Sequence, residues 1–336
     1  MMRTRLSLPA VILVMTPAAC ICLTLLSVLY GAKDISADTV WAALTSFDSS
    51  NVDHQIIRSS RLPRALGALL IGAFLAVSGA LMQGMTRNYL ASPSIMGVAD
   101  GSVFAVTAVM IFLPNTSSFG LIFSSMIGSL LGALLVFGLA WAVPGGLGPV
   151  KLAILGTIVG TFLSGLASAV SVYFQISQNI SFWYNARLHS MDPGLIKFSL
   201  PFAAVGLLIA MGLTKYVTLL ALGEDAAKGL GVRTWLIRAL CTVAVVIMTG
   251  VSVALAGKIA FVGLIIPHIA RFLAGMDYRR IVPVSGALGA IFLLSCDIIA
   301  RFINYPFETP VGVVTSLIGV PFFLYLIKTK GGKGHA

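Results

Sequence analysis

The chain has 336 residues, of which 58% are hydrophobic and only 10% are charged, and its mean hydropathy is +1.00. Soluble domains are about 45–50% apolar, so this composition excludes a soluble protein and indicates an all-α polytopic membrane protein. The net charge of +11 would by itself suit a nucleic-acid-binding protein. Nucleic acid is excluded as a partner because the basic residues are dispersed between apolar runs and form no cluster with interleaved aromatic residues.

Ten apolar runs are about long enough to cross a bilayer as helices. In chain order they cover residues 8–30, 62–82, 94–113, 119–142, 151–174, 196–214, 239–256, 259–275, 281–300 and 310–328. No soluble domain separates them, which predicts one transmembrane domain over residues 1–336. Runs two to five and seven to ten would have opposite orientations, and this allows an inverted repeat as in many transporters.

The first run follows Arg3 and Arg5, as the core of a signal peptide would. It continues to about Leu29, beyond the usual ~7–15 residues of such a core, so we expect a retained span. The cysteines lie inside apolar runs and have no disulfide or metal-ligand spacing, which makes packing their expected role. They are Cys20, Cys22, Cys241 and Cys296.

The basic residues between the runs indicate an orientation. If the amino terminus is cytoplasmic, eight of the 22 Lys and Arg residues fall in outer segments and the other fourteen in inner ones. The outer eight are Lys33, Arg58, Arg61, Arg64, Arg187, Lys197, Lys258 and Arg301. The positive-inside rule therefore favours cytoplasmic positions for both termini.

Two places in the first half of the chain leave alternatives open. Asp100 marks either a buried polar contact or the entry to the third run. The outer segment Ser181–Gly194 carries Phe182, Trp183 and Tyr184, which suit either an interfacial aromatic belt or the entrance of a pathway.

The segment from Lys215 to Arg238 joins runs six and seven on the inner side. Gly229 and Gly231 predict two short helices separated by a turn, and Glu224 at a helix start would be favoured by the helix dipole. The segment is either an amphipathic loop on the membrane surface or a docking element for a cytoplasmic partner. Its expected contact residues are Leu222, Glu224, Asp225, Leu230, Val232 and Arg233.

The stretch Gly257–Arg280 is apolar yet contains Pro267, His268 and Arg271. An ionisable group inside a span costs about 2.5 to 3.5 kcal/mol unless it faces protein or water. A proton relay through His268 would need acidic partners, but the candidates are scattered over other runs; they are Asp100, Asp297 and Glu308. We therefore expect a structural role, in which Pro267 bends the helix while His268 and Arg271 bind carbonyl groups near its inner end.

Glu308 and Pro310 open the last run. A carboxylate at a helix amino terminus is favoured by the helix dipole, so capping is the expected role of Glu308. Both residues recur in the family pattern described next.

Four segments, which together cover about residues 58–330 in order, resemble the FecCD-type permease subunits of ABC importers for iron siderophores, haem and cobalamin. They are RLPRALGALLIGAFLAVSGALMQGMTRNYLASPSIMGVADG, LALGEDAAKGLGVR, AGKIAFVGLIIPHIARFLAGMDYRRIVP and ETPVGVVTSLIGVPFFLYLI. One departure is Tyr89, where the family typically has Pro, so the turn after Asn88 is expected to be less rigid.

The resemblance implies ten helices per subunit, a dimer of two permeases of the same or similar sequence, two ATPase subunits and an extracytoplasmic binding protein in a bacterial cell (inner) membrane. It also makes the Lys215–Arg238 segment the coupling element that contacts an ATPase. The chain lacks a G-x-x-x-x-G-K-[ST] loop, so we expect no enzyme activity in it, no catalytic residue and no cofactor. ATP and Mg²⁺ would bind to the partner ATPase.

The family docks its binding protein through arginines at positions that match Arg61, Arg64 and Arg301. A guanidinium group pairs bidentately with a carboxylate, which suits this role. The alternatives are lipid headgroup binding for Arg61 and Arg64 and, for Arg301, an ion pair with Asp297 one helical turn away.

The cargo is the least determined property. The four histidines, at positions 54, 189, 268 and 334, are far apart in sequence and predict no metal site, so a chelated ion is expected instead of a bare one. An iron siderophore is the first choice, and haem and cobalamin stay open. The other function classes are an ion-coupled secondary transporter, which would need paired charges in broken helices, and a membrane sensor or scaffold.

Overall fold

The computed structural model describes residues 8–31, 33–94, 97–143, 149–178, 188, 191–305 and 307–331, and the regular elements in these residues are helical. Their bounds are α1 Leu8–Leu29, α2 Ala37–Thr45, α3 Val52–Ile56, the π-helical turn η1 Ile57–Arg61, α4 Leu62–Thr86, α5 Val98–Phe112, α6 Ser118–Ala142, α7 Pro149–Tyr173, α9 Pro193–Leu222, α10 Glu224–Gly229, α11 Thr234–Ala256, α12 Val262–Ala274, α13 Tyr278–Phe302 and α14 Val311–Gly331. Each of the ten predicted spans overlaps one of these helices.

Seven of the described helices are long and apolar enough to cross a membrane, and three more are apolar but shorter. The short ones are α5, α12 and the first sixteen residues of α14, which end at Leu326. The prediction of an all-α polytopic fold is confirmed. Two of the three short helices, α5 and α12, begin inside the bundle, as described below.

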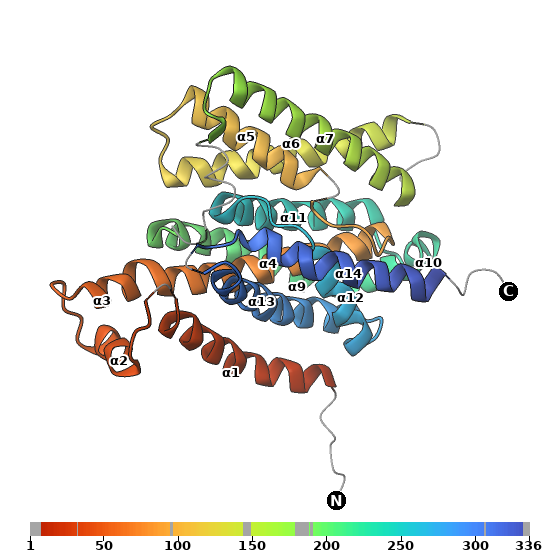
Figure 1. Cartoon of the computed structure of the whole chain (residues 1–336). Helices are drawn as coiled ribbons and strands as arrows, with labels where there is room; N and C mark the ends of the chain where they lie inside the picture. Colours follow the sequence, from red (N-terminus) through yellow and green to blue (C-terminus); the bar gives the residue numbers. More distant parts are fainter. Residues whose placement is uncertain are drawn as a thin grey trace, which may run out of the picture.

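Helix α4 lies at the centre of the molecule (Figure 1) and contacts α1, α9, α11, α12 and α13. Helices α5, α6 and α7 form a layer on one side of α11, and α1 lies on the opposite side of the bundle along α13 (Figure 1). The short helices α2 and α3 lie at one end of the bundle and α10 at the other. Helix α4 thereby joins the two halves of the chain.

Glycine allows the helices around α4 to touch backbone to backbone. A Cβ added at Gly79 would lie 1.8 Å from the carbonyl oxygen of Gly263 on α12. One added at Gly72 would lie 2.2 Å from the carbonyl oxygen of Gly289 on α13. Because lipid tails are as apolar as leucine, such close van der Waals packing is what holds helices together in a membrane.

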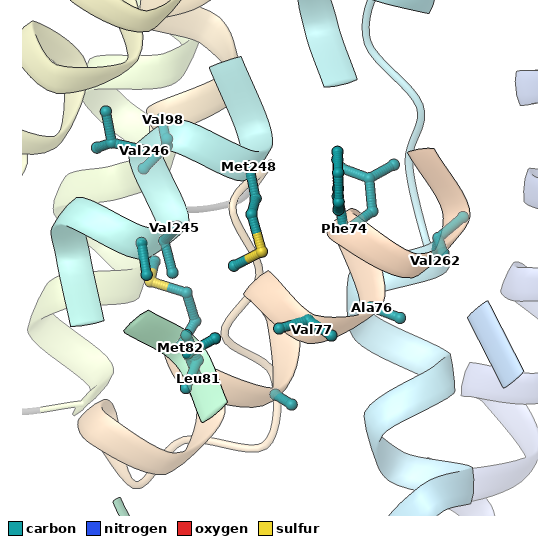
Figure 2. Close-up of a cluster of buried hydrophobic side chains, with 14 of the residues drawn as sticks. Phe74, Ala76, Val77, Leu81, Met82, Val98, Val245, Val246, Met248 and Val262 are labelled. Atoms are coloured by element: carbon teal, nitrogen blue, oxygen red, sulfur yellow. The ribbon is translucent and has the colours of Figure 1, made fainter. Parts of the chain in front are cut away.

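Large apolar side chains fill the remaining space between α4 and its neighbours. Figure 2 shows Leu81 and Met82 of α4 beside Val245 of α11, and Phe74 of α4 on the side of Val262 of α12. Each of the five is at most 1% exposed. This contact between the central helices of the two halves forms the core of the described structure.

Helices α5 and α12 both begin inside the bundle. A Cβ at Gly101, near the start of α5, would lie 2.2 Å from the carbonyl oxygen of Gly128, in the middle of α6. Gly263, near the start of α12, packs against Gly79 in the interior of α4. The chain approaches both helix starts through non-helical segments, of which residues 87–94 and 257–261 are described. Irregular backbone at membrane depth is tolerated where protein surrounds it.

The helix contacts have the pattern that an inverted repeat requires. In such a repeat α4, α5, α6 and α7 correspond to α11, α12, α13 and α14. Helix α4 packs on α12 and α13, and its counterpart α11 packs on α5 and α6. The two short helices that begin inside the bundle, α5 and α12, are also counterparts.

The inner segment differs in length from the prediction. Residues 215–222 continue α9, so the non-spanning part is reduced to Gly223, the helix α10 and the turn that leads to Thr234. The start of α1 and the end of α14 lie on the same side of the bundle as α10 (Figure 1).

Candidate functional site

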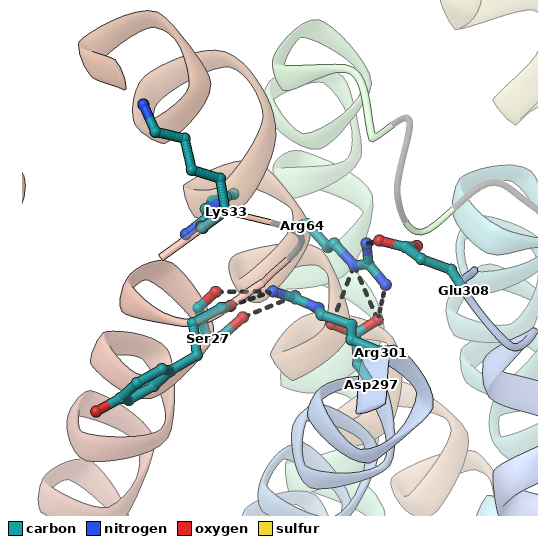
Figure 3. A network of polar contacts seen from close by, with 8 residues as sticks. Ser27, Lys33, Arg64, Asp297, Arg301 and Glu308 are labelled. Atoms are coloured by element: carbon teal, nitrogen blue, oxygen red, sulfur yellow. Dashed lines mark hydrogen bonds and ion pairs between the residues drawn. The ribbon is translucent and has the colours of Figure 1, made fainter. Parts of the chain in front are cut away.

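Four charged residues form a cluster at the α2–α3 end of the bundle (Figure 3), here called the charge cluster: Arg64, Asp297, Arg301 and Glu308. The Nε of Arg64 donates to both carboxylate oxygens of Asp297, at 2.9 and 3.0 Å, and its Nη1 donates to both oxygens of Glu308 at 2.8 Å. The Nη2 of Arg301 donates to Asp297 Oδ2 at 2.5 Å. Asp297 is fully buried, so both of its ion pairs with guanidinium groups lie away from water.

Arginines also bind the carboxyl-terminal end of α1. Arg301 Nη1 donates to the carbonyl oxygen of Ser27 at 2.7 Å, and Arg61 Nη1 donates to those of Val28 and Leu29 at 2.6 and 3.1 Å. The last four carbonyl groups of a helix have no intrahelical donor, and a cation is favoured there by the helix dipole. The two guanidinium groups therefore anchor α1 by its end.

Arg61, Arg64 and Arg301, the residues predicted to dock a binding protein, are buried in this chain. Their exposed fractions are 8%, 7% and 6%, because each finds its partners within this chain. The alternative of an ion pair between Arg301 and Asp297 is confirmed, whereas the described partners of Arg61 and Arg64 are protein groups instead of lipid headgroups. Docking of a binding protein through these residues stays a prediction.

Glu308 has a different role from the expected one. Helix α14 begins at Val311, directly after Pro310. Both carboxylate oxygens of Glu308 accept hydrogen bonds from Arg64, so this side chain joins α14 to α4 instead of capping α14. Glu308 is 40% exposed and is thus the part of the charge cluster nearest to solvent.

At the opposite end of the bundle, Arg271 of α12 is buried among polar side chains. Its Nη2 donates to Gln83 Oε1 at 2.9 Å and to the Tyr278 hydroxyl at 3.3 Å. The guanidinium carbon lies 4.1 Å from the centre of the Tyr89 ring, a cation–π contact. The partners are side chains on α4, α13 and the turn after α4, so the expected carbonyl partners are wrong for Arg271.

The other two residues of that motif also lie inside the packed protein. Pro267 lies inside α12 and is buried. The ring of His268 is half-buried and meets the ring of Phe322 on α14 edge to face, with centroids 6.2 Å apart. Their position inside the packed protein favours the structural role expected from the sequence.

The coupling segment, defined here as residues 222–233, projects from the end of the bundle as a turn, the helix α10 and a second turn. Glu224 begins α10 as predicted and forms ion pairs with Lys228 at 3.0 Å and with Arg238 at 2.8 Å. The hydrogen bond from Lys228, followed by that from Arg238, lowers the pKa of Glu224 below its ordinary value of 4.5. Gly223 and Gly231 have φ of 137° and 78°, values that favour glycine and that set the turns on either side of α10.

The apolar residues of the coupling segment differ in accessibility. Leu222 is 71% exposed and Leu230 is 66% exposed, and Asp225 and Arg233 are exposed beside them. Val232 is half-buried and packs against the main core. Four of the six expected contact residues are therefore exposed, and Glu224, like Val232, is half-buried. Glu224 is engaged in its own ion pairs.

Asp100, at the start of α5, makes a buried polar contact, one of the two roles left open. Its Oδ1 accepts from Lys258 Nζ at 2.5 Å and from Ser164 Oγ at 2.6 Å, and its side chain is only 4% exposed. Placing Lys258 in an outer segment was wrong, because it meets Asp100 inside the bundle. A lone lysine within the apolar stretch that begins at Gly257 was the sequence signal for this pair.

Other expectations fall on residues outside those described. Residues 179–187 and 189–190 contain most of Ser181–Gly194, including its three aromatic residues. His189 also lies outside the described residues, whereas His54 and His268 lie within them. Within the described ranges, no group of three or more His, Cys, Asp or Glu residues could hold a metal ion.

Comparisons with known proteins cover almost the whole chain. The model of the FecCD transport family matches residues 19–329. The iron-uptake system permease protein FeuB of Bacillus subtilis is 59% identical, with 96% of this chain and 97% of FeuB aligned. The iron(3+)-hydroxamate import system permease protein FhuB of the same organism is 50% identical over 96% of this chain and 84% of FhuB.

A solved structure has the same fold. It is that of a metal-chelate type ABC transporter in an inward-facing conformation, with a TM-score of 0.80 and 29% sequence identity. The alignment covers 95% of this chain and 99% of that one.

Proposed function

The chain belongs to the FecCD transport family, and from this premise we propose that it passes an iron siderophore from an extracytoplasmic binding protein to the cytoplasm. It is a permease subunit of a bacterial ABC importer of iron chelates and a multi-pass membrane protein, and permeases of this family have no ATPase activity of their own. The observation that carries the proposal is the match to the family along residues 19–329.

Relatives support iron siderophores as the cargo. FeuB is named for iron uptake and FhuB for import of iron(3+)-hydroxamate. The described residues hold no candidate metal site, which suits a permease that moves a chelated ion through a passage. Haem and cobalamin are the alternative cargoes.

We propose that the coupling segment contacts a partner ATPase that binds ATP and Mg²⁺. Leu222 and Leu230 offer exposed apolar side chains there, and Asp225 and Arg233 offer exposed charges. Gly223 and Gly231 bracket a short helix that projects at the end of the bundle, where a cytoplasmic partner could reach it. The complete importer would contain two permeases, two ATPases and one binding protein.

Docking of the binding protein is proposed for the end that carries the charge cluster. Arg64 is buried, but its partner Glu308 is 40% exposed, so a carboxylate of the binding protein could replace Glu308 on Arg64. Arg61 and Arg301 would act beside it by holding the end of α1 in place. Exposed Arg58, which stacks on Phe47 at 4.7 Å, adds an accessible guanidinium group at the same end.

This arrangement implies an orientation. The coupling segment would face the cytoplasm, as would both termini, in a bacterial cell membrane. The start of α1 and the end of α14 lie on the α10 side of the bundle, which supports this assignment. Residues 1–336 would then form a single transmembrane permease domain.

Reconstitution tests the function directly. The chain is co-expressed with its ATPase, with and without a second, similar permease, and the complex is placed in proteoliposomes with ATP inside and iron-loaded binding protein outside. We expect uptake of iron chelate that requires both ATP and the binding protein. Uptake driven by an ion gradient without the ATPase would contradict the proposal and support a secondary transporter.

A further inference from the structure

A lysine and an aspartate form an ion pair halfway along the membrane-spanning helices. Ser164, which donates to Asp100, is the sixteenth of the 25 residues of α7, and a Cβ at Gly160 would lie 2.6 Å from Asp100 Oδ2. Gly101 packs on Gly128 near the middle of α6. Both helices are candidate membrane spans, so Asp100 lies near mid-membrane depth.

Lys258 reaches Asp100 from the non-helical segment that precedes α12. Its Nζ lies 2.5 Å from Asp100 Oδ1, and its side chain is 38% exposed, whereas that of Asp100 is 4% exposed. The carboxylate is thus enclosed, whereas more than a third of the lysine side chain is exposed at the surface of this subunit.

A charge in that position is not compatible with lipid. Placing a lysine in the hydrocarbon core costs about 2.5 to 3.5 kcal/mol or more, so such residues face protein or a water-filled passage. The exposed side of Lys258 therefore faces the interior of the permease dimer.

The neighbouring face of α7 is polar over the same depth. Residues 157, 161, 164 and 168 lie at spacings of four, three and four, which places them on one face of a helix. They are Thr157, Thr161, Ser164 and Ser168, and three of them are exposed while Ser164 is half-buried against Asp100. A row of accessible hydroxyl groups beside an accessible ammonium group is what the wall of an aqueous passage requires.

We propose that Lys258 lines the translocation pathway at mid-membrane depth and contacts anionic oxygen atoms of the iron chelate as it passes. Asp100 is the positioning residue, because it holds the ammonium group and balances its charge when no cargo is present. Catecholate and carboxylate groups, which carry negative charge around the iron, are the ligand chemistry that this site favours. The inference rests on the proposed function and narrows it to anionic chelates.

Accessibility tests the first half of the proposal. Lys258→Cys in the complete importer is treated with a membrane-impermeant, water-soluble thiol reagent, and labelling is compared with that of the unsubstituted protein. Leu208→Cys is the control, since Leu208 is 73% exposed near the middle of α9 on an apolar surface. We expect labelling of Lys258→Cys and little of Leu208→Cys, because a thiolate forms only where water reaches it. Absence of labelling at position 258 would overturn the placement in the pathway.

Uptake tests the second half. Proteoliposomes of the unsubstituted importer are offered a ferric tris-catecholate, ferric citrate and a neutral ferric tris-hydroxamate, each with the binding protein. We expect one of the anionic chelates to be transported best. A preference for the neutral chelate would overturn the proposal, and uptake of none of them would instead contradict the proposed function.

Substitution of Lys258 then distinguishes an effect of its charge on uptake from an effect on folding. With the best anionic chelate, Lys258→Gln is expected to lower the initial uptake rate about tenfold, whereas Lys258→Arg stays within about twofold. Stimulation of ATP hydrolysis by the binding protein shows that the complex is still assembled. Unchanged uptake by Lys258→Gln would overturn the proposal. If neither variant assembles, the thiol labelling of Lys258→Cys and the chelate preference of the unsubstituted importer still decide it.

Discussion

Arg64 on α4 and Asp297 on α13 form a buried ion pair at 2.8 Å, although 233 residues separate them in the sequence. Asp297 also accepts from Arg301, so two buried guanidinium groups share one fully buried carboxylate, and Glu308 supplies the second negative charge. The pair fastens the two halves of the chain at the end of the bundle that we assign to binding-protein docking.

Removing the negative charge at this point should destabilise the protein strongly. Asp297→Asn keeps the shape of the side chain but leaves Arg64 and Arg301 short of a counter-charge, for which we expect a loss of about 3 to 5 kcal/mol. Denaturant-induced unfolding of the purified protein in detergent measures the change. Asp53→Asn is the control: its ion pair with Lys33 is exposed, so its effect should stay within about 1 kcal/mol. Equal effects of the two substitutions would contradict this account of the charge cluster.

The backbone contact between α4 and α12 should not tolerate a methyl group. In Gly79→Ala the new Cβ would overlap the carbonyl oxygen of Gly263, and we expect a loss of at least about 1 to 3 kcal/mol from overpacking. Gly212→Ala on α9 has open space around its Cβ and should stabilise the helix by about 0.5 to 1 kcal/mol. Thermal unfolding of the two variants in the same detergent gives the comparison. A neutral Gly79→Ala would show that the two helices can separate freely.

The exposed leucines of the coupling segment should matter for assembly and little for stability. The double variant Leu222→Ser, Leu230→Ser loses apolar surface from the proposed ATPase contact, so co-purification with the ATPase should fall about tenfold or more. Its thermal midpoint should stay close to that of the unsubstituted protein, because both side chains are largely exposed. Leu44→Ser, with 56% exposure on α2 at the opposite end, should leave co-purification unchanged. Loss of co-purification in the Leu44→Ser control as well would contradict the role assigned to the coupling segment.

The ion pairs of Glu224 should make α10 sensitive to acid. The hydrogen bond from Lys228 holds the pKa of Glu224 below 4.5 in the folded protein, so its stabilisation is complete above that pH and is lost as the pH falls through the lowered value. The difference in thermal midpoint between the unsubstituted protein and Glu224→Gln should be positive at pH 7 and smaller at pH 3. Asp225→Asn, one residue further along the same helix and exposed, is the control and should give a small difference at both pH values. A Glu224→Gln difference that is the same at both pH values would show that the ion pairs do not stabilise α10.

Tyr89 stands where the family pattern has proline, and its ring should stabilise the turn after α4 in place of that proline. Tyr89→Ala removes the face on which the buried guanidinium of Arg271 lies, at an expected loss of about 1 to 2 kcal/mol, whereas Tyr89→Phe keeps that face. Denaturant unfolding of both variants measures the difference. Similar losses in the two would assign the effect to the tyrosine hydroxyl and not to the ring.

The sequence was sufficient to find the helices because the bilayer demands long apolar runs wherever the chain crosses it. It could not show that α5 and α12 begin at mid-depth, since an averaged apolar run contains no sign of where its helix starts. Gly101 and Gly263 are the residues that permit this, and their role depends on which backbone passes beside them.

The sites were harder to predict for the same reason. The contacts of Arg64 with Asp297 and Glu308 join residues far apart in the sequence, and they depend on how α4, α13 and α14 pack. The resemblance to a family assigned the outer arginines a partner outside the chain, whereas their burial shows that they first have partners within it. Glu224 was predictable because its interaction with Lys228 is local, one turn along a single helix.

The capping of α1 by arginines also constrains how the protein is made. Ser27 lies 274 residues before Arg301, its hydrogen-bond partner, and only 11% of the span formed by α1 is buried against the rest of the chain. Arg61 can hold the end of α1 as soon as α4 begins to form, but the contact with Arg301 can form only after nearly all of the chain up to α13 has been inserted. Completion of the packing of α1 against α13 is thus a late step in biogenesis, and a chain truncated before α13 would leave that face of α1 uncovered.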